Sequence, residues 1–239
     1  MALDPEVLKK LQIFMAAAIL IAGVRAGYIV YERHEATKDE RPTQETALKA
    51  DYYVTPKKLY PYDLKSARQL TEQPVWVKAG YQITYYPYDG ARKKTDFAHE
   101  TGTLPPLQKL AIQDVVTGIS AQAPGVKQVL AVFSLEGKSY AVPIGAEKDG
   151  EFKIRSDDMF FVQDPHELYK HWPAEVWQKV DAHEVQAGMN ELQCSFAIGM
   201  GIPEGSGDYG SRTLHYANGG KPLVISFEDD KAVAIKPGA

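Results

Sequence analysis

Residues 188–203, GMNELQCSFAIGMGIP, contain a full set of helix start and stop signals. Asn190 is a preferred N-cap residue, and Gln193 completes a capping box in which each side chain bonds the other residue's backbone N–H. Gly199 suits the conformation that ends many helices, and Pro203 cannot continue one. The stretch therefore predicts a helix between Asn190 and Gly199.

A second helix is expected before this stretch, and strands are expected after it. Pro173 stands where a first helical turn tolerates proline, and Val176, Trp177 and Val180 supply an apolar face. A glycine-rich loop at 205–210 then leads to three strand-like runs separated by turn residues, at 212–217, 222–227 and 231–236. Residues 166–239 are therefore predicted to be an α+β domain of two helices followed by a three-stranded antiparallel meander.

This part of the chain resembles the BamE/SmpA-like domain over residues 175–236. The likeness rests on the run Gly-Met-Asn-Glu-Leu-Gln-Cys at 188–194, the run Phe-Ala-Ile-Gly at 196–199, Pro203, and the strands that carry Tyr216 and Phe227. Cys194 replaces the family's usual valine, the family is typically lipidated, and it lacks the section at 51–165. The resemblance implies a small α+β domain of the bacterial cell envelope that binds other proteins, supports outer-membrane protein assembly and has no catalytic residues.

Residues 51–165 are predicted to form a β-rich domain with one helix. Short apolar or alternating runs, separated by glycine turns, indicate strands at 75–77, 81–85, 128–133, 139–144, 152–155 and 159–162. Residues 107–120 (LQKLAIQDVVTGIS) have their apolar side chains at helical spacing, so the helix is expected there.

A long apolar segment, LQIFMAAAILIAGVRAGYIVY, occupies residues 11–31. As a helix it would span roughly 30 Å, the thickness of a bilayer's hydrocarbon core, and Arg25 lies off-centre, where its side chain can reach the interface. We expect an uncleaved signal-anchor at 1–34 and a charged linker at 35–50. A cleaved signal peptide and a helix buried in a soluble core are the alternatives. Basic residues flank both sides, but a large domain after one N-terminal anchor is usually exported, so a periplasmic location is expected.

The composition excludes several classes of function. The 239-residue chain has a net charge of −4 and only short basic runs, so no nucleic-acid partner is indicated. Cys194 is the only cysteine, which excludes an internal disulfide and a lipid-modified cysteine near the N-terminus. His183-Glu184 lacks the second histidine of a zinc-protease helix, and Glu204 replaces the first glycine of a nucleophile elbow. No catalytic, metal-binding or cofactor-binding residue is predicted.

Eight tyrosines lie between residues 52 and 88, where they either pack on strand faces or form an aromatic surface for a partner chain or for peptidoglycan: Tyr52, Tyr53, Tyr60, Tyr62, Tyr81, Tyr85, Tyr86 and Tyr88. In the C-terminal domain, Tyr209 and Arg212 are the candidate protein-binding residues, because they lie in or beside an exposed glycine-rich loop.

The sequence as a whole predicts a single-pass, membrane-anchored, non-catalytic bacterial envelope protein. It would bind other proteins as a subunit or accessory of an envelope or membrane complex, and membrane lipid through its anchor. The alternative is an enzyme or a small-ligand receptor with its site in the β-rich domain.

Overall fold

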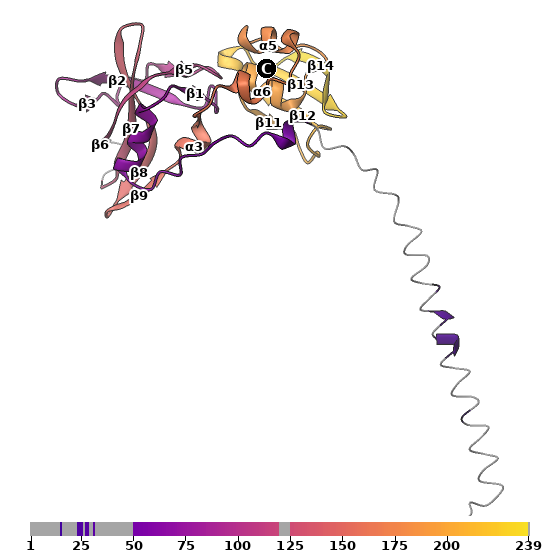
Figure 1. The fold of residues 1–239 in the computed structure, drawn as a ribbon. Helices are drawn as coiled ribbons and strands as arrows, with labels where there is room; N and C mark the ends of the chain where they lie inside the picture. The colour runs from indigo at the N-terminus through magenta and orange to yellow at the C-terminus, as the bar shows by residue number, and fades with distance from the viewer. Residues whose placement is uncertain are drawn as a thin grey trace, which may run out of the picture. The chain divides into compact units, whose positions relative to one another are not determined.

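The computed structural model consists of two units, residues 1–49 and 50–239 (Figure 1). It describes residues 15, 23–25, 27–28, 31, 50–119 and 125–238. The predicted anchor at 1–34 and linker at 35–50 lie, apart from these few positions, outside the described residues. Among the described helices, none is long and apolar enough to cross a membrane.

The largest sheet is a seven-stranded antiparallel sheet in the first half of the second unit. Its main path runs β3 (Lys94–Thr95), β2 (Thr84–Asp89), β8 (Lys138–Lys148), β7 (Lys127–Leu135) and β6 (Ile112–Ile119). β4 (Gly102–Thr103) pairs with β2, and β9 (Glu151–Ile154) pairs with β8. The strands expected at 128–133, 139–144 and 152–155 are confirmed.

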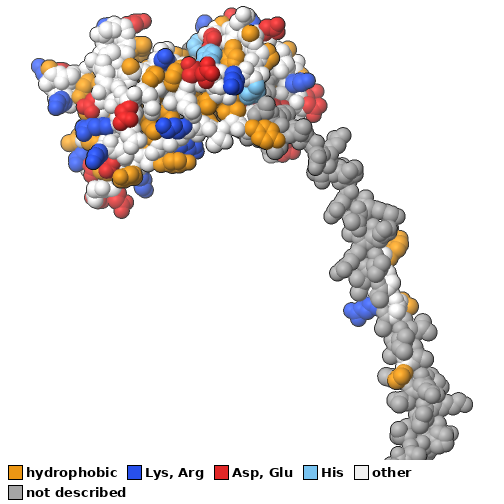
Figure 2. Space-filling view, viewed as in Figure 1, with side chains coloured by type: hydrophobic (Ala, Val, Ile, Leu, Met, Phe, Trp, Pro, Cys, Tyr) orange, Lys and Arg blue, Asp and Glu red, His pale blue; other side chains and the backbone are white. Residues whose placement is uncertain are grey.

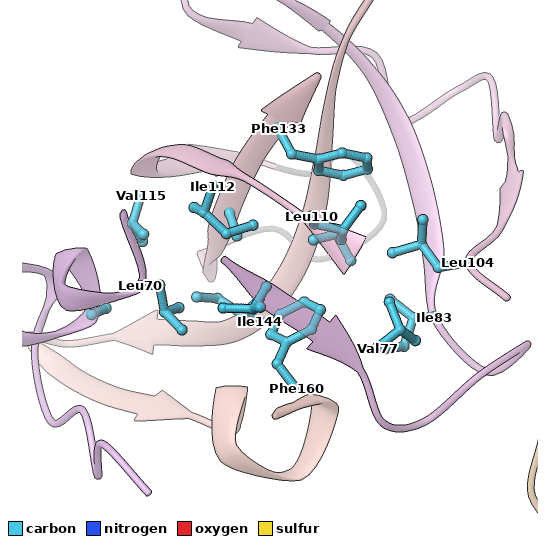
Figure 3. Packing of buried hydrophobic residues seen from close by; sticks show 14 of the residues in the cluster. Leu70, Val77, Ile83, Leu104, Leu110, Ile112, Val115, Phe133, Ile144 and Phe160 are labelled. Carbon is cyan, nitrogen blue, oxygen red and sulfur yellow. The ribbon is translucent and has the colours of Figure 1, made fainter. Parts of the chain in front are cut away.

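One face of this sheet packs on the first hydrophobic core. Phe133 of β7 and Ile144 of β8 lie in a common interior with Leu104 and Leu110, as Figure 3 shows. Leu70 of the short helix η2 (Arg68–Thr71) closes the core on one side. Because side chains alternate along a strand, the other face carries a smaller cluster of Leu130, Val132 and Ala141, against which Tyr88 and Phe97 pack.

The helix expected at 107–120 is wrong, because this segment forms two strands, β5 (Lys109–Leu110) and β6. β6 pairs with β7 from Ile112 opposite Phe133 to Ile119 opposite Lys127. Its β-branched residues are stiff at χ1 and favour a strand. A register shift between Ile112 and Asp114 breaks the two-residue alternation, so the apolar spacing imitates a helix. The helical elements of this half are short: η1 (Ala50–Tyr53), α2 (Leu64–Ala67), η2 and α3 (Ser156–Met159).

The helical elements of the C-terminal section are α4 (Pro165–Leu168), α5 (Ala174–Asp181), α6 (Glu191–Ile198) and the short η3 (Asn218–Gly220). The predicted capping box of α6 is confirmed. Gln193 N donates to Asn190 Oδ1 at 2.8 Å, and Asn190 N donates to Gln193 Oε1 at 3.0 Å. Gly199 ends the helix with φ at 89°, a conformation that residues with a Cβ rarely adopt.

The C-terminal sheet has four strands and not the predicted three. They are β11 (Gly201–Pro203), β12 (Thr213–Tyr216), β13 (Leu223–Glu228) and β14 (Lys231–Pro237), in sequential antiparallel order. The prediction treated residues 201–203 only as a helix stop, whereas Ile202 lies opposite His215. Leu214, Tyr216 and Ile225 pack with α5 and α6 in a second hydrophobic core. The predicted α+β class is therefore correct.

Each edge strand of this sheet carries a proline whose backbone faces away from its neighbour. Glu204 N donates to Thr213 O, so Pro203, one residue earlier, turns its backbone outward from β12. By the same alternation, Gly238 N donates to Pro222 O, and Pro237 turns outward from β13. Proline has no N–H, so each edge lacks a donor that a further strand would use.

A third sheet, ordered β10 (Phe160–Phe161), β1 (Val75–Val77) and β5, lies between the two cores. Val75 and Val77 face the first core, whereas Trp76 faces the second, as the alternation of a strand requires. Phe160 and Phe161 divide in the same way, and the Phe161 ring lies 5.5 Å from that of Phe196 in α6. The second core is therefore built partly from residues before 166.

Asp51 ties the start of the second unit to the C-terminal section. Its Oδ1 accepts hydrogen bonds from His171 Nε2 at 2.6 Å and Trp172 Nε1 at 2.7 Å. Its Oδ2 accepts one from Asn190 Nδ2 at 2.9 Å. Asn190 thus caps α6 with its oxygen and holds Asp51 with its nitrogen.

Candidate interaction surface

Arg212, one of the two predicted contact residues, forms an intramolecular ion pair with Glu191. Arg212 Nη2 lies 2.7 Å from Glu191 Oε2, and its Nε lies 3.1 and 3.2 Å from the two Glu191 oxygens. The Glu191 side chain is only 4% exposed, and that of Arg212 is 23% exposed. Two donors from one guanidinium make this a strong, directional pair, and it raises the pKa of Arg212 further.

The ion pair also fixes the loop at 205–212. Gly210 N donates to Glu191 Oε1 at 2.6 Å, and Asp230 N, in the turn between β13 and β14, donates to Gly210 O at 2.7 Å. A Cβ on Gly210, whose φ is 83°, would lie 2.9 Å from the Asp230 Cβ, so this approach requires glycine. The end of the predicted contact loop is therefore held by α6 and by the β13–β14 turn.

Tyr209 is the exposed member of the predicted pair, with 54% of its surface accessible. The guanidinium carbon of Arg212 lies 5.4 Å from the centroid of its ring, within the range of a cation–π interaction. The structure therefore brings the two residues together but gives them different positions. Tyr209 faces solvent, and Arg212 supports it from within.

The eight tyrosines of the β-rich section do not form one surface. Tyr85 packs against Phe133 at 5.8 Å, Tyr86 packs against Phe97 at 5.2 Å, and Tyr88 lies on the smaller cluster. Tyr53, Tyr60 and Tyr62 are exposed at 70%, 72% and 76%, while the side chain of Tyr52 lies outside the described residues. On the face shown in Figure 2, hydrophobic side chains lie scattered among charged ones.

Tyr81 has a packing role that the sequence does not reveal. A Cβ on Gly219 would stand 2.8 Å from the Tyr81 ring, and one on Gly199 would stand 3.1 Å from it. The ring is thus seated against two glycines of the C-terminal section, and burial raises the pKa of its hydroxyl.

The histidines and the cysteine have structural contacts. His166 stacks on Trp177 at 4.1 Å and contacts Asp164 and Asp181, and His183 Nδ1 lies 3.0 Å from Ala197 O. Cys194 is buried, and desolvation raises the pKa of its thiol to about 12. Within the described part of the chain, no three His, Cys, Asp or Glu side chains are placed to hold a metal ion.

Comparisons of the chain with models of protein families, with curated proteins and with solved structures found no match.

Proposed function

We propose that this protein is a single-pass, membrane-anchored, non-catalytic protein of the bacterial cell envelope that binds other proteins. Its C-terminal section, a domain of BamE/SmpA-like type exposed to the periplasm, is the binding module. The apolar segment at 11–31 and the sequence resemblance at 175–236 support this proposal. The succession of two longer helices and an antiparallel sheet in the C-terminal section is consistent with it.

The observation that carries the binding proposal is the support beneath Tyr209. An aromatic side chain that is exposed before binding brings a large contact area, and little conformational entropy is lost if its surroundings are already fixed. Arg212 lies against this ring and is itself held by buried Glu191. We therefore place Tyr209 at the centre of the binding surface.

Crosslinking in cells, followed by capture of the full-length protein from native membranes, tests this surface. Tyr209→Ala is compared with Tyr62→Ala, a matched control that removes another exposed tyrosine far along the chain. We expect Tyr209→Ala to lose crosslinked partners and Tyr62→Ala to retain them, with unchanged thermal unfolding in both. Equal partner recovery from wild type and Tyr209→Ala contradicts the proposal. Loss of crosslinked partners with Tyr62→Ala alone would instead assign the binding surface to the β-rich section.

The anchor is tested separately by membrane extraction. A helix at 11–31 that spans the bilayer keeps the full-length protein in the membrane fraction after alkaline carbonate treatment, whereas a peripheral protein is released. Protease access in intact and permeabilised cells then reports the side on which the C-terminal section lies. Release by carbonate overturns the anchor but leaves the Tyr209 surface as a proposal of its own.

A further inference from the structure

A cleft of about 480 Å³ lies where β1, β2, β8 and α3 approach the end of α6. Its volume falls within the range of small-ligand sites, and Ala79, Ile83 and Met159 of its lining also belong to or pack on the first hydrophobic core. Lys78, Arg155 and Asp158 supply its charged groups, and Met159 and Met200 supply much of its apolar lining. None of its lining residues belongs to the 205–212 loop.

The walls of this cleft are held by backbone contacts. Lys78 N donates to Met159 O at 2.7 Å, which joins the end of β1 to α3. Tyr81 N donates to Leu104 O at 2.7 Å and fixes the turn before β2. A Cβ on Gly199 would lie 2.8 Å from Gly80 O, so the glycine allows α6 to end close to this turn and sets the next residue, Met200, on the cleft.

The charged groups of the cleft are not paired with one another. Among the described residues, Lys78, Arg155 and Asp158 take part in none of the ion pairs, whereas Arg68, Lys127, Lys179 and Arg212 each pair with a carboxylate. The ammonium of Lys78 lies 5.5 Å from the Phe161 ring, which helps to hold it in place. The cleft therefore offers two cations to a ligand, beside one carboxylate that disfavours polyanions such as polyphosphates.

We propose that this cleft binds the free carboxyl end of a peptide whose last residue is apolar. The terminal carboxylate would pair with Lys78 and Arg155, and the last side chain would lie on Met159 and Met200, whose flexible side chains adapt to different shapes. Gln82 and Thr84 also line the cleft and can bond peptide amides, which a simple fatty acid lacks.

The test is a titration of the full-length protein carrying ¹³C-methyl methionine, followed by NMR. The probe is N-acetyl-leucyl-leucine, and its C-terminal amide and hexanoate are the comparison ligands. We expect the probe to shift the Met159 and Met200 methyl signals and to leave that of Met189, which is buried in the second core, unchanged. The amide should bind at least about tenfold more weakly, because it lacks the charge that the two cations recognise.

The matched variants decide between recognition and general charge effects. Lys78→Gln/Arg155→Gln should weaken binding of the probe at least tenfold. Lys138→Gln/Lys153→Gln, which removes the same charge outside the cleft, should not. Equal binding of acid and amide, or equal effects of the two double variants, overturns the proposal. Hexanoate binding as tightly as the probe assigns the cleft to carboxylates in general and contradicts the peptide. Because Tyr209 takes no part, either site can fail without the other.

Discussion

Arg212 and Glu191, 21 residues apart in sequence, form a largely buried ion pair with 2.7 Å between Nη2 and Oε2. This pair has two consequences. It makes Arg212 a poor candidate for direct partner contact, and we expect it to make Arg212 important for stability. A double substitution of Tyr209 and Arg212 would therefore confuse an effect on binding with an effect on folding.

Arg212→Ala should lower the free energy of unfolding by about 3 kcal/mol, the lower end of the range for breaking a buried pair, because the arginine is partly exposed. The variant leaves Glu191 buried without its cation. Urea unfolding of the single variants and of Arg212→Ala/Glu191→Ala measures the coupling. We expect the double variant to lose less than the sum of the single losses. Additive losses would show that the pair does not stabilise the fold.

Asn190→Ala should cost about 0.5–2 kcal/mol, because it removes the N-cap of α6. Asn190→Asp separates this role from the contact with Asp51. The aspartate retains a capping oxygen but places a second carboxylate 2.9 Å from Asp51 in the wild-type geometry. Asn190→Asp should therefore destabilise the protein, and Asp51→Asn should restore stability in that background. If restoration fails in thermal unfolding, the Asp51 contact is not the cause.

Gly199→Ala should be more destabilising than Gly188→Ala. Both glycines have positive φ, 89° and 87°, which costs about 1–3 kcal/mol for other residues. A Cβ at 188 meets open space, whereas one at 199 lies 2.8 Å from Gly80 O. Denaturant unfolding measures the difference. Equal losses would mean that the end of α6 can move away from Gly80 at no cost.

Cys194 should give the stability a dependence on alkaline pH. Burial raises the pKa of its thiol to about 12, above the value of about 8.5 in an unfolded chain. The resulting stabilisation is complete below about pH 8 and is lost as the pH rises towards the folded-state pKa. We expect the free energy of unfolding to fall more steeply over this window in wild type than in Cys194→Ala. Parallel curves for the two proteins contradict the assignment.

The sequence predicted local features better than distant contacts. The capping box at Asn190 and Gln193 involves residues three apart, so its chemistry is visible in the sequence and was confirmed. Residues 107–120 were misread because their pairing with β7 is decided by residues that come later in the chain.

The site residues show the same limit. Arg212 was recognised as important, but its partner lies 21 residues away, and nothing local indicates the pair. Asp51 bonds His171, Trp172 and Asn190, which lie 120, 121 and 139 positions further along the chain. Its role therefore emerges only when the second core has formed. The cleft brings together β1, α3 and the residue after Gly199, and no linear pattern marks it.

Pro203 and Pro237 bear on how this protein behaves when many copies are crowded together. An edge strand with a full row of donors is a template on which another chain can grow, and repeated growth leads to fibres. In the C-terminal sheet, each edge strand lacks one backbone N–H donor, because Pro203 and Pro237 face outward there. Pairing of a further strand at either edge is therefore disfavoured, and contacts of this sheet with other molecules are left mainly to its side chains.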